Sequence, residues 1–311
     1  MATGFRQCLI GLITCGLLTS CQQTASTPAP DVPVRTIEHA MGSTQVPVSP
    51  QRVVVLDYAP LDTALALDIL PVGRTIVTVS PIYPETINNI TIVGDGLQPS
   101  LEAILKLKPD LILGSKVSAG KWYRQLSKIA PTILTKDNGR KGNWQENFRL
   151  YADSLGQAEQ AEQLLAAYQQ RVDNLRSGGT LPPETMTASV ITTWSRGVVV
   201  YSASSFPGSV LQDLGFERNP TQGEGRRHGI QLSREDLSDM DGDILFLMHQ
   251  SAAEDSISKT EFVSDPLWSA LNAVKQGIVC EVDSTTWAGG RSILAANQIL
   301  TDVEFCLTQE N

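Results

Sequence analysis

The sequence has few of the residues from which catalytic and metal sites are usually built. Among 311 residues there are three histidines, His39, His228 and His249, and they are scattered along the chain. Zinc and manganese sites need clustered histidine and carboxylate ligands, so we expect no metal held by the protein's own side chains. The chain has no G-x-S-x-G elbow and no P-loop, and no nucleophile stands beside an evident base. These absences argue against an enzyme and against a resident cofactor.

Positive charge is also scarce. The chain has 24 Lys and Arg residues against 33 Asp and Glu, a net charge of −9. Arg6 is the only charged residue among the first 20, so the rest of the chain is more acidic still. Such a surface disfavours nucleic acid and anionic lipid as partners. No apolar run after residue 20 is long enough to cross a bilayer.

The first 20 residues have the pattern of a secretory signal. Arg6 precedes an apolar run from Leu9 to Leu18, which is too short for a membrane span and is followed by small residues. The segment Leu18-Thr19-Ser20-Cys21 is typical of a lipoprotein signal, in which the Cys21 thiol receives the lipid before cleavage. An ordinary signal peptide with a chance cysteine is the alternative. We therefore expect a lipid-anchored protein on the cell membrane, facing the periplasm or the cell exterior.

Cysteine usage after the signal leaves one candidate pair. Cys8 and Cys15 leave with the signal and Cys21 carries the lipid, so Cys280 and Cys306 are the two that could form a disulfide. An oxidising compartment would permit this bond. Two separate buried thiols are the alternative.

The sequence divides into five segments. Residues 1–20 are the predicted signal, and residues 21–35 are a proline-rich polar tether, lipidated at its start. An N-terminal α/β lobe is expected over 36–143, a long connecting helix over 144–178 and a C-terminal α/β lobe over 179–311.

Short apolar strands alternate with helical stretches in both predicted lobes. Arg52–Leu56 is a β-branched run followed by the helical pattern of Leu61–Leu70, and Ala188–Thr193 opens the second lobe. This alternation predicts an α/β fold: two Rossmann-like lobes with mainly parallel sheets. A shift of 133 residues brings a second copy of one pattern onto the first, so the lobes look like one unit used twice. The first copy has Ser100, Glu102, Ile104, Leu107, Asp110, Leu111 and Ile112; the second has Ser233, Glu235, Leu237, Met240, Asp243, Ile244 and Leu245.

The stretch between the lobes predicts a long helix. Trp144–Arg176 contains no proline, and its apolar residues recur at steps of three and four from Phe148 to Leu175. Gly156 is a place where this helix could kink. The part after it would be about 30 Å long, enough to join one lobe to the other.

Aromatic and cationic side chains gather where the predicted strands end. Ligands of parallel α/β sheets bind at the carboxyl ends of the strands. An aromatic wall with a few cations suits a bulky, oxygen-rich anionic ligand. The candidates at strand ends are Tyr58, Lys116, Trp122, Trp194, Arg196 and Trp287, and the polar glycine loop 223–229 adds Arg226 and Arg227. The alternative for the tryptophans is packing in the core, and for the arginines a solvated surface loop.

Four segments resemble the iron-siderophore substrate-binding lipoproteins of ABC importers. They are HAMGSTQVPVSPQRVVVLDY (39–58), PSLEAILKLKPDLIL (99–113), SFPGSVLQDLGF (205–216) and WAGGRSILAANQILTDVE (287–304). The resemblance implies two lobes joined by one long helix and a monomer that captures a ferric siderophore between them. It also implies a permease and its ATPase as partners. Iron arrives already chelated, so the protein would grip the outer surface of the chelate.

The resemblance also implies contacts with the permease, one acidic residue on each lobe. Glu102 matches on the first lobe, whereas Gln212 stands where the family usually has glutamate, and Asp213 is the neighbouring acid. The family's hydroxamate binders often carry an arginine where this chain has Asp95-Gly96, so positive charge must come from the other predicted cations.

Other functions remain open from the sequence. A cobalamin- or haem-binding protein of the same fold is the nearest alternative, and Tyr58 would be the axial ligand to test for haem. A lipid-anchored enzyme with the same fold and a sensory or adhesive lipoprotein are the alternatives from other functional classes.

Overall fold

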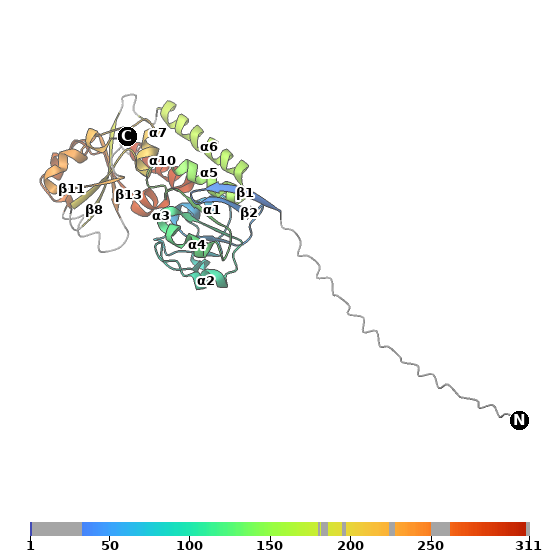
Figure 1. The fold of residues 1–311 in the computed structure, drawn as a ribbon. Helices are drawn as coiled ribbons and strands as arrows, with labels where there is room; N and C mark the ends of the chain where they lie inside the picture. Colours follow the sequence, from blue (N-terminus) through green and yellow to red (C-terminus); the bar gives the residue numbers. More distant parts are fainter. Residues whose placement is uncertain are drawn as a thin grey trace. The chain divides into compact units, whose positions relative to one another are not determined.

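The computed structural model describes residue 1 and residues 33–179, 181, 186–194, 197–223, 228–249 and 262–308. The predicted signal, Cys21 and most of the tether therefore lie outside the described residues. From Pro33 onward the chain forms one compact unit, drawn in colour in Figure 1. No helix among the described residues is both long enough and apolar enough to span a bilayer.

The N-terminal lobe is built on a five-stranded parallel sheet. Its strand order is β5-β4-β3-β6-β7, and every neighbouring pair is parallel. The central strands are apolar on both faces because helices and loops cover both sides. The strands are β3 (Val53–Val55), β4 (Gly73–Arg74), β5 (Thr91–Ile92), β6 (Leu111–Ser115) and β7 (Thr132–Thr135).

Short helices connect these strands. The helix predicted over Leu61–Leu70 is α1, which starts earlier because Asp57 caps its N-terminus. The helical elements of this lobe are α1 (Tyr58–Ala66), η1 (Glu85–Asn89), α2 (Leu101–Lys106), α3 (Lys116–Ala119), η2 (Gly120–Trp122) and α4 (Tyr123–Leu126).

A β-hairpin precedes the first lobe. Its strands are β1 (Val34–His39) and β2 (Gly42–Pro47), joined by a turn at Ala40 and Met41; Gly42 starts β2 with a φ of 118°. The Ala40 amide donates to the Leu134 carbonyl of β7, which attaches the hairpin to the lobe. β1 thus starts at Val34, inside the segment predicted as a tether, because Val34 and Arg35 pair with Pro47 and Val46.

The connecting segment consists of two helices rather than one kinked helix. α5 (Trp144–Ser154) and α6 (Ala158–Ser177) are separated at Gly156, whose φ is 81°. A backbone in that left-handed region cannot continue a right-handed helix. The predicted three- and four-residue pattern is confirmed, since Leu165, Tyr168 and Val172 of α6 are buried.

The C-terminal lobe has a six-stranded mixed sheet. Its order is β11-β9-β8-β12-β13, with β10 also paired to β8. β8, β12, β13 and β10 run parallel, whereas β9 and β11 are antiparallel to their neighbours. The strands are β8 (Thr187–Trp194), β9 (Gly197–Tyr201), β10 (Glu217–Arg218), β11 (Gly229–Leu232), β12 (Ile244–His249) and β13 (Val279–Asp283).

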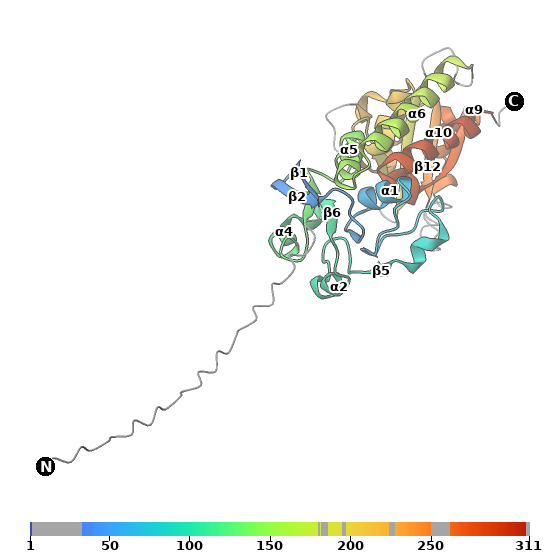
Figure 2. The ribbon, with the colours of Figure 1, turned by 90° about the vertical axis from the view of Figure 1, so that its right-hand side faces the viewer.

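The helical elements of this lobe include a long C-terminal helix, α10, which lies beside α6 in Figures 1 and 2. α10 also contacts α1 of the first lobe and α7 of its own. The elements are α7 (Phe206–Asp213), η3 (Pro220–Gln222), η4 (Arg234–Met240), η5 (Trp268–Ala270), α9 (Asn272–Gln276), the π-helix η6 (Thr285–Gly290) and α10 (Ile293–Thr308).

The predicted internal repeat is present in the structure. Ser100 caps α2 before β6, and Ser233 caps η4 before β12. β6 starts at Leu111 and β12 at Ile244, which is the 133-residue shift read from the sequence. The predicted α/β class with two lobes is confirmed. The antiparallel β9 and β11 are where the second lobe departs from the first.

Candidate ligand-binding site

Two neighbouring strands of the N-terminal sheet deliver polar side chains to the same edge. Asp57 follows β3 and Ser115 ends β6, and the Ser115 hydroxyl donates to Oδ2 of Asp57 over 3.0 Å. Both side chains are buried. Tyr58, next to Asp57, is half-buried, and its hydroxyl accepts a hydrogen bond from the Thr78 amide over 3.1 Å.

Arg291 of the C-terminal lobe reaches into this edge. Its Nη2 lies 3.3 Å from Oδ1 of Asp57, and its guanidinium carbon is 5.0 Å from the centre of the Tyr58 ring. Nη1 donates to the Asn138 carbonyl and Nε to the Gly289 carbonyl. Burial lowers the pKa of Arg291, and the Asp57 carboxylate opposes that effect. The pair therefore joins the lobes through buried opposite charges.

Arg291 is not among the ligand residues predicted from the sequence. It follows the Gly289-Gly290 pair shortly after β13, and its own backbone has a φ of 57°. Ligands of parallel α/β sheets bind at the carboxyl ends of the strands, and this rule could also have selected Arg291. The residue stands in the same post-strand segment as Trp287, which was selected.

A second buried carboxylate links the lobes. Asp62 of α1 accepts from the amides of Leu294 and Ala295 over 3.0 and 3.1 Å, at the start of α10. The Tyr83 hydroxyl also donates to it. Burial raises the pKa of Asp62 to about 7, although these hydrogen bonds pull it down. A side chain of one lobe thus satisfies free N–H groups at a helix N-terminus of the other.

Hydroxyl pairs continue this junction. Thr63 and Ser292 are 2.9 Å apart between their hydroxyl oxygens, and Ser80 and Thr286 are 2.6 Å apart. All four side chains are buried. The lobes are therefore joined by a hydrogen-bonded polar interface at the base of the site.

Two of the predicted residues on the first lobe follow β6. Lys116 is the exposed first residue of α3. Trp122 is half-buried, and its indole N–H donates to the Leu97 carbonyl over 3.1 Å. The ammonium of Lys121 lies 5.4 Å from its ring. Trp122 is thus a partly open aromatic surface with a cation over it.

Trp287 lies in the core. Its side chain is 0% exposed, its ring packs 4.8 Å from that of Phe246, and its indole N–H donates to Asp302 over 2.7 Å. In this structure the ring therefore packs inside the C-terminal lobe and offers no wall to a ligand, which is the alternative that the sequence left open for the tryptophans.

Several predicted ligand residues lie outside the described residues. These are Arg196, Arg226 and Arg227, together with the side chain of Trp194, whose backbone ends β8. Their places at strand and loop ends stay predictions.

The two residues predicted to meet a permease differ in environment. Glu102 of α2 is 78% exposed and pairs with Lys106 one turn later. Asp213 at the end of α7 accepts a hydrogen bond from the Tyr168 hydroxyl of α6 over 2.8 Å, and burial raises its pKa. Asp213 is therefore engaged in fastening α6 to α7, whereas its neighbour Gln212 is exposed.

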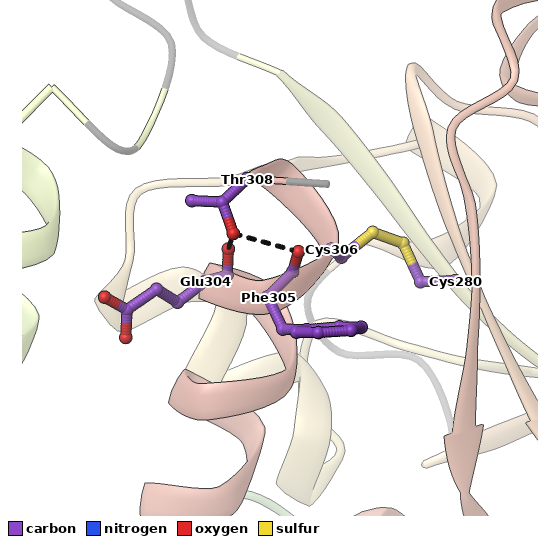
Figure 3. The surroundings of a disulfide bond; sticks show 5 residues. All are labelled: Cys280, Glu304, Phe305, Cys306 and Thr308. Carbon is purple, nitrogen blue, oxygen red and sulfur yellow. Dashed lines mark hydrogen bonds between the residues drawn. A yellow bond between two sulfur atoms is a disulfide. The ribbon is translucent and has the colours of Figure 1, made fainter. Parts of the chain in front are cut away.

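Cys280 of β13 and Cys306 of α10 form a disulfide, with their Cα atoms 5.9 Å apart (Figure 3). The bond attaches the last helix to an edge strand of the second sheet. Among the described residues there is no group of three His, Cys, Asp or Glu side chains that could hold a metal ion.

Hollows open along the lobe junction. One of about 330 Å³ lies between residues 78–88 of the first lobe and Asp283 and Thr285 of the second. Another, of about 150 Å³, is lined by Arg140 of the first lobe and by Tyr201, Phe206 and His228 of the second. A larger hollow of about 910 Å³ runs along β13 beside the disulfide, but none of the predicted ligand residues lines it.

Most of the chain is similar to known binding proteins. The family model described as "Periplasmic binding protein" matches residues 53–286. The "Probable siderophore-binding lipoprotein YfiY" of Bacillus subtilis is 36% identical, over 93% of this chain and 93% of its own. The "Fe(3+)-citrate-binding protein YfmC" of the same organism is 31% identical, over 94% and 92%.

A solved structure extends the similarity to three dimensions. The crystal structure of Staphylococcus aureus SirA complexed with staphyloferrin B matches with a TM-score of 0.77 and 32% identity, over 88% of this chain and 98% of that one. With strand order, lobe repeat and length-wide similarity in agreement, this chain belongs to the periplasmic binding protein family.

Proposed function

We propose that this protein is the extracytoplasmic substrate-binding lipoprotein of an ABC importer and that it captures a ferric siderophore between its lobes. The observation that carries the proposal is the similarity over nearly the full chain to proteins named for siderophore and ferric-citrate binding. The structural match to a chain bound to staphyloferrin B adds to it.

The site is suited to a ligand that brings its own metal. The described residues offer no metal-binding cluster. They do offer aromatic surface at Tyr58 and Trp122 and exposed positive charge at Lys116 and Arg140. Such groups bind the outer oxygens of a chelate through ring contact and charge-assisted hydrogen bonds.

Haem binding is less well supported. The hydroxyl of Tyr58 already accepts the Thr78 amide, and its ring is covered by the Arg291 guanidinium. An axial ligand must turn its oxygen toward iron. The side chain would have to give up both contacts first.

Membrane attachment and delivery complete the proposal. A lipid on Cys21 would confine capture to the membrane surface and raise the local concentration near a permease. Glu102 is exposed on the first lobe, and its surface ion pair with Lys106 would be exchanged for one with a cationic partner. Asp213 is held by Tyr168, so the second-lobe contact would involve the exposed surface around Gln212.

The test is a titration of the purified, processed protein, whose mass also reports the lipid on Cys21. Ferric citrate, a ferric hydroxamate, a ferric catecholate, haem and cobalamin are added in turn while tryptophan fluorescence is followed. We expect saturable quenching by at least one ferric siderophore complex in the micromolar range or tighter. Quenching by haem or cobalamin alone would refute the proposal.

A further inference from the structure

A small hollow at the lobe junction brings together an arginine, a tyrosine and a histidine. Arg140 comes from the loop between β7 and α5, Tyr201 from the end of β9, and His228 from the residue before β11. Phe206 and Pro207, at the start of α7, form its apolar side. Its volume of about 150 Å³ is below the usual size of a site for a whole small molecule. It has room for one arm of a larger ligand.

The loop that carries Arg140 is held in place. The Phe206 amide of α7 donates to the Arg140 carbonyl over 3.1 Å. The carboxylate of Asp137 accepts from the Gly139 amide and from the Asn143 side chain, over 2.9 and 2.6 Å. This nearby negative charge is thus engaged within the loop. The backbone of Arg140 is fixed while its side chain stays exposed at the hollow.

Positive charge is in excess here, although the protein as a whole is acidic. Burial lowers the pKa of His228, and the charges of Arg140, Lys141 and Arg291 lower it further. Arg291 is paired with Asp57. Among the residues that the structure describes, no carboxylate forms an ion pair with Arg140 or Lys141. The hollow therefore favours an anionic group.

We propose that this hollow is a subsite for a free carboxylate arm of a ferric hydroxycarboxylate chelate, with Arg140 as its charged contact and Tyr201 and His228 as hydrogen-bond partners. The inference rests on the proposed function and narrows its ligand class. A guanidinium matches the two oxygens of a carboxylate with parallel hydrogen bonds. In a ferric tris-catecholate or tris-hydroxamate the chelating oxygens are bound to iron, so those complexes have no free carboxylate for this subsite.

The experiment compares Arg140→Gln with the wild-type protein. The probes are ferric citrate and a ferric tris-hydroxamate without a free carboxylate, and the readout is the dissociation constant from fluorescence quenching. Arg149→Gln is the matched control, because it removes the same charge from an exposed surface pair with Glu162. Unchanged melting temperatures establish that the variants fold. Arg140→Lys keeps the positive charge but removes the paired N–H donors of the guanidinium, so it tests those donors separately from the charge.

We expect Arg140→Gln to weaken ferric citrate binding by roughly tenfold or more, as for a lost charge-assisted hydrogen bond. Arg140→Lys should recover part of the loss, and Tyr201→Phe should weaken binding by a few fold. Arg149→Gln should leave it unchanged. A folded Arg140→Gln protein that binds ferric citrate within twofold of wild type overturns the subsite.

The series of ferric complexes distinguishes a failure of the subsite from a failure of the proposed function. If the wild-type protein binds a hydroxamate or catecholate complex and no carboxylate complex, the subsite is wrong and the proposed function stands. If it binds no ferric complex at all, the proposed function fails, and the subsite fails with it.

Discussion

At the scale of single residues, two carboxylates bind the C-terminal lobe to the N-terminal lobe: Asp57, the N-cap of α1, and Asp62, within α1. Asp57 meets Arg291 and Asp62 meets the start of α10, with all the side chains involved buried. Removing one partner of a buried ion pair leaves the other charge unpaired, at a cost of about 3 to 5 kcal/mol. The contacts near the site therefore also set how the lobes meet.

Asp62 makes stability depend on pH. Its pKa is about 7 in the folded protein, against 3.8 for an unperturbed aspartate. Between these values the unfolded chain loses the proton while the folded protein keeps it, so stability falls as pH rises from about 4 to 7. Above that range both states are ionised and this contribution no longer changes.

We expect Asp62→Asn to remove this contribution. The asparagine oxygen can still accept one amide of α10, but it does not titrate. As pH rises from 4 to 7, the free energy of unfolding of the variant should increase by a few kcal/mol relative to that of the wild type, as measured by urea unfolding. Asp68→Asn, an exposed aspartate just after the same helix, is the control. A difference between Asp62→Asn and wild type that stays constant with pH would contradict the prediction.

At the scale of elements, the break between α5 and α6 has a local cause. Gly156 has a φ of 81°, and a Cβ there would collide with the Val48 carbonyl oxygen. The chain after β2 therefore passes against the turn too closely for any side chain. A left-handed glycine ends one helix, and its lack of a side chain lets the hairpin segment pack there.

Gly156→Ala should destabilise the protein by roughly 2 to 4 kcal/mol, from backbone strain together with the collision. Gly277→Ala is the matched control, since Gly277 has a φ of 80° and no atom within 4 Å of the position of an added Cβ. It should cost about 1 kcal/mol from strain alone. Both values come from urea unfolding, and equal losses in the two variants would show that the contact with Val48 contributes nothing.

At the scale of the whole molecule, the lobes share one apolar core. A single buried cluster runs from Val53 and Leu111 of the first lobe through Trp144 and Tyr168 of the connecting helices to Ile299 of α10. Such a core couples the lobes mechanically. It favours modest closure around a ligand, since a large rotation would expose this surface.

The disulfide fastens the end of the chain to this core. It closes a loop of 26 residues between Cys280 and Cys306. The loop-entropy model gives about 3.5 kcal/mol for such a constraint on the unfolded chain. We expect Cys280→Ser with Cys306→Ser to lower the free energy of unfolding by about that amount. A reductant should destabilise the wild type and leave the double variant unchanged; equal stability without reductant would refute the prediction.

The sequence predicted much of the local structure. Apolar runs located β3 and β8, and the pattern of α6 gave its buried face. The 133-residue repeat aligned the starts of β6 and β12. These succeeded because residue spacing directly reflects which face of a strand or helix is buried. The hairpin of β1 and β2 was missed because its residues carry no strong apolar alternation.

The candidate site was only partly within reach of the sequence. Strand-end reasoning selected Tyr58 and Trp122, which remain accessible, but also Trp287, which is fully buried. Arg140, a lone arginine in a loop, has no distinguishing pattern, whereas Arg291 follows β13 in the same segment as Trp287 and was within reach of the same rule. Side-chain direction after a strand depends on what packs against it from elsewhere in the chain.

What the sequence by itself determined is the alternation of strands and helices in both lobes, the place of the helix break and the segments that resemble the family. Only the tertiary structure decided which residues meet across the lobes: Asp57 with Arg291, Asp62 with the start of α10, and Arg140 with Tyr201 and His228. Asp57 and Arg291 are 234 residues apart in the chain. Local periodicity records burial within one element, whereas contacts over such separations arise only when the lobes pack on a common core.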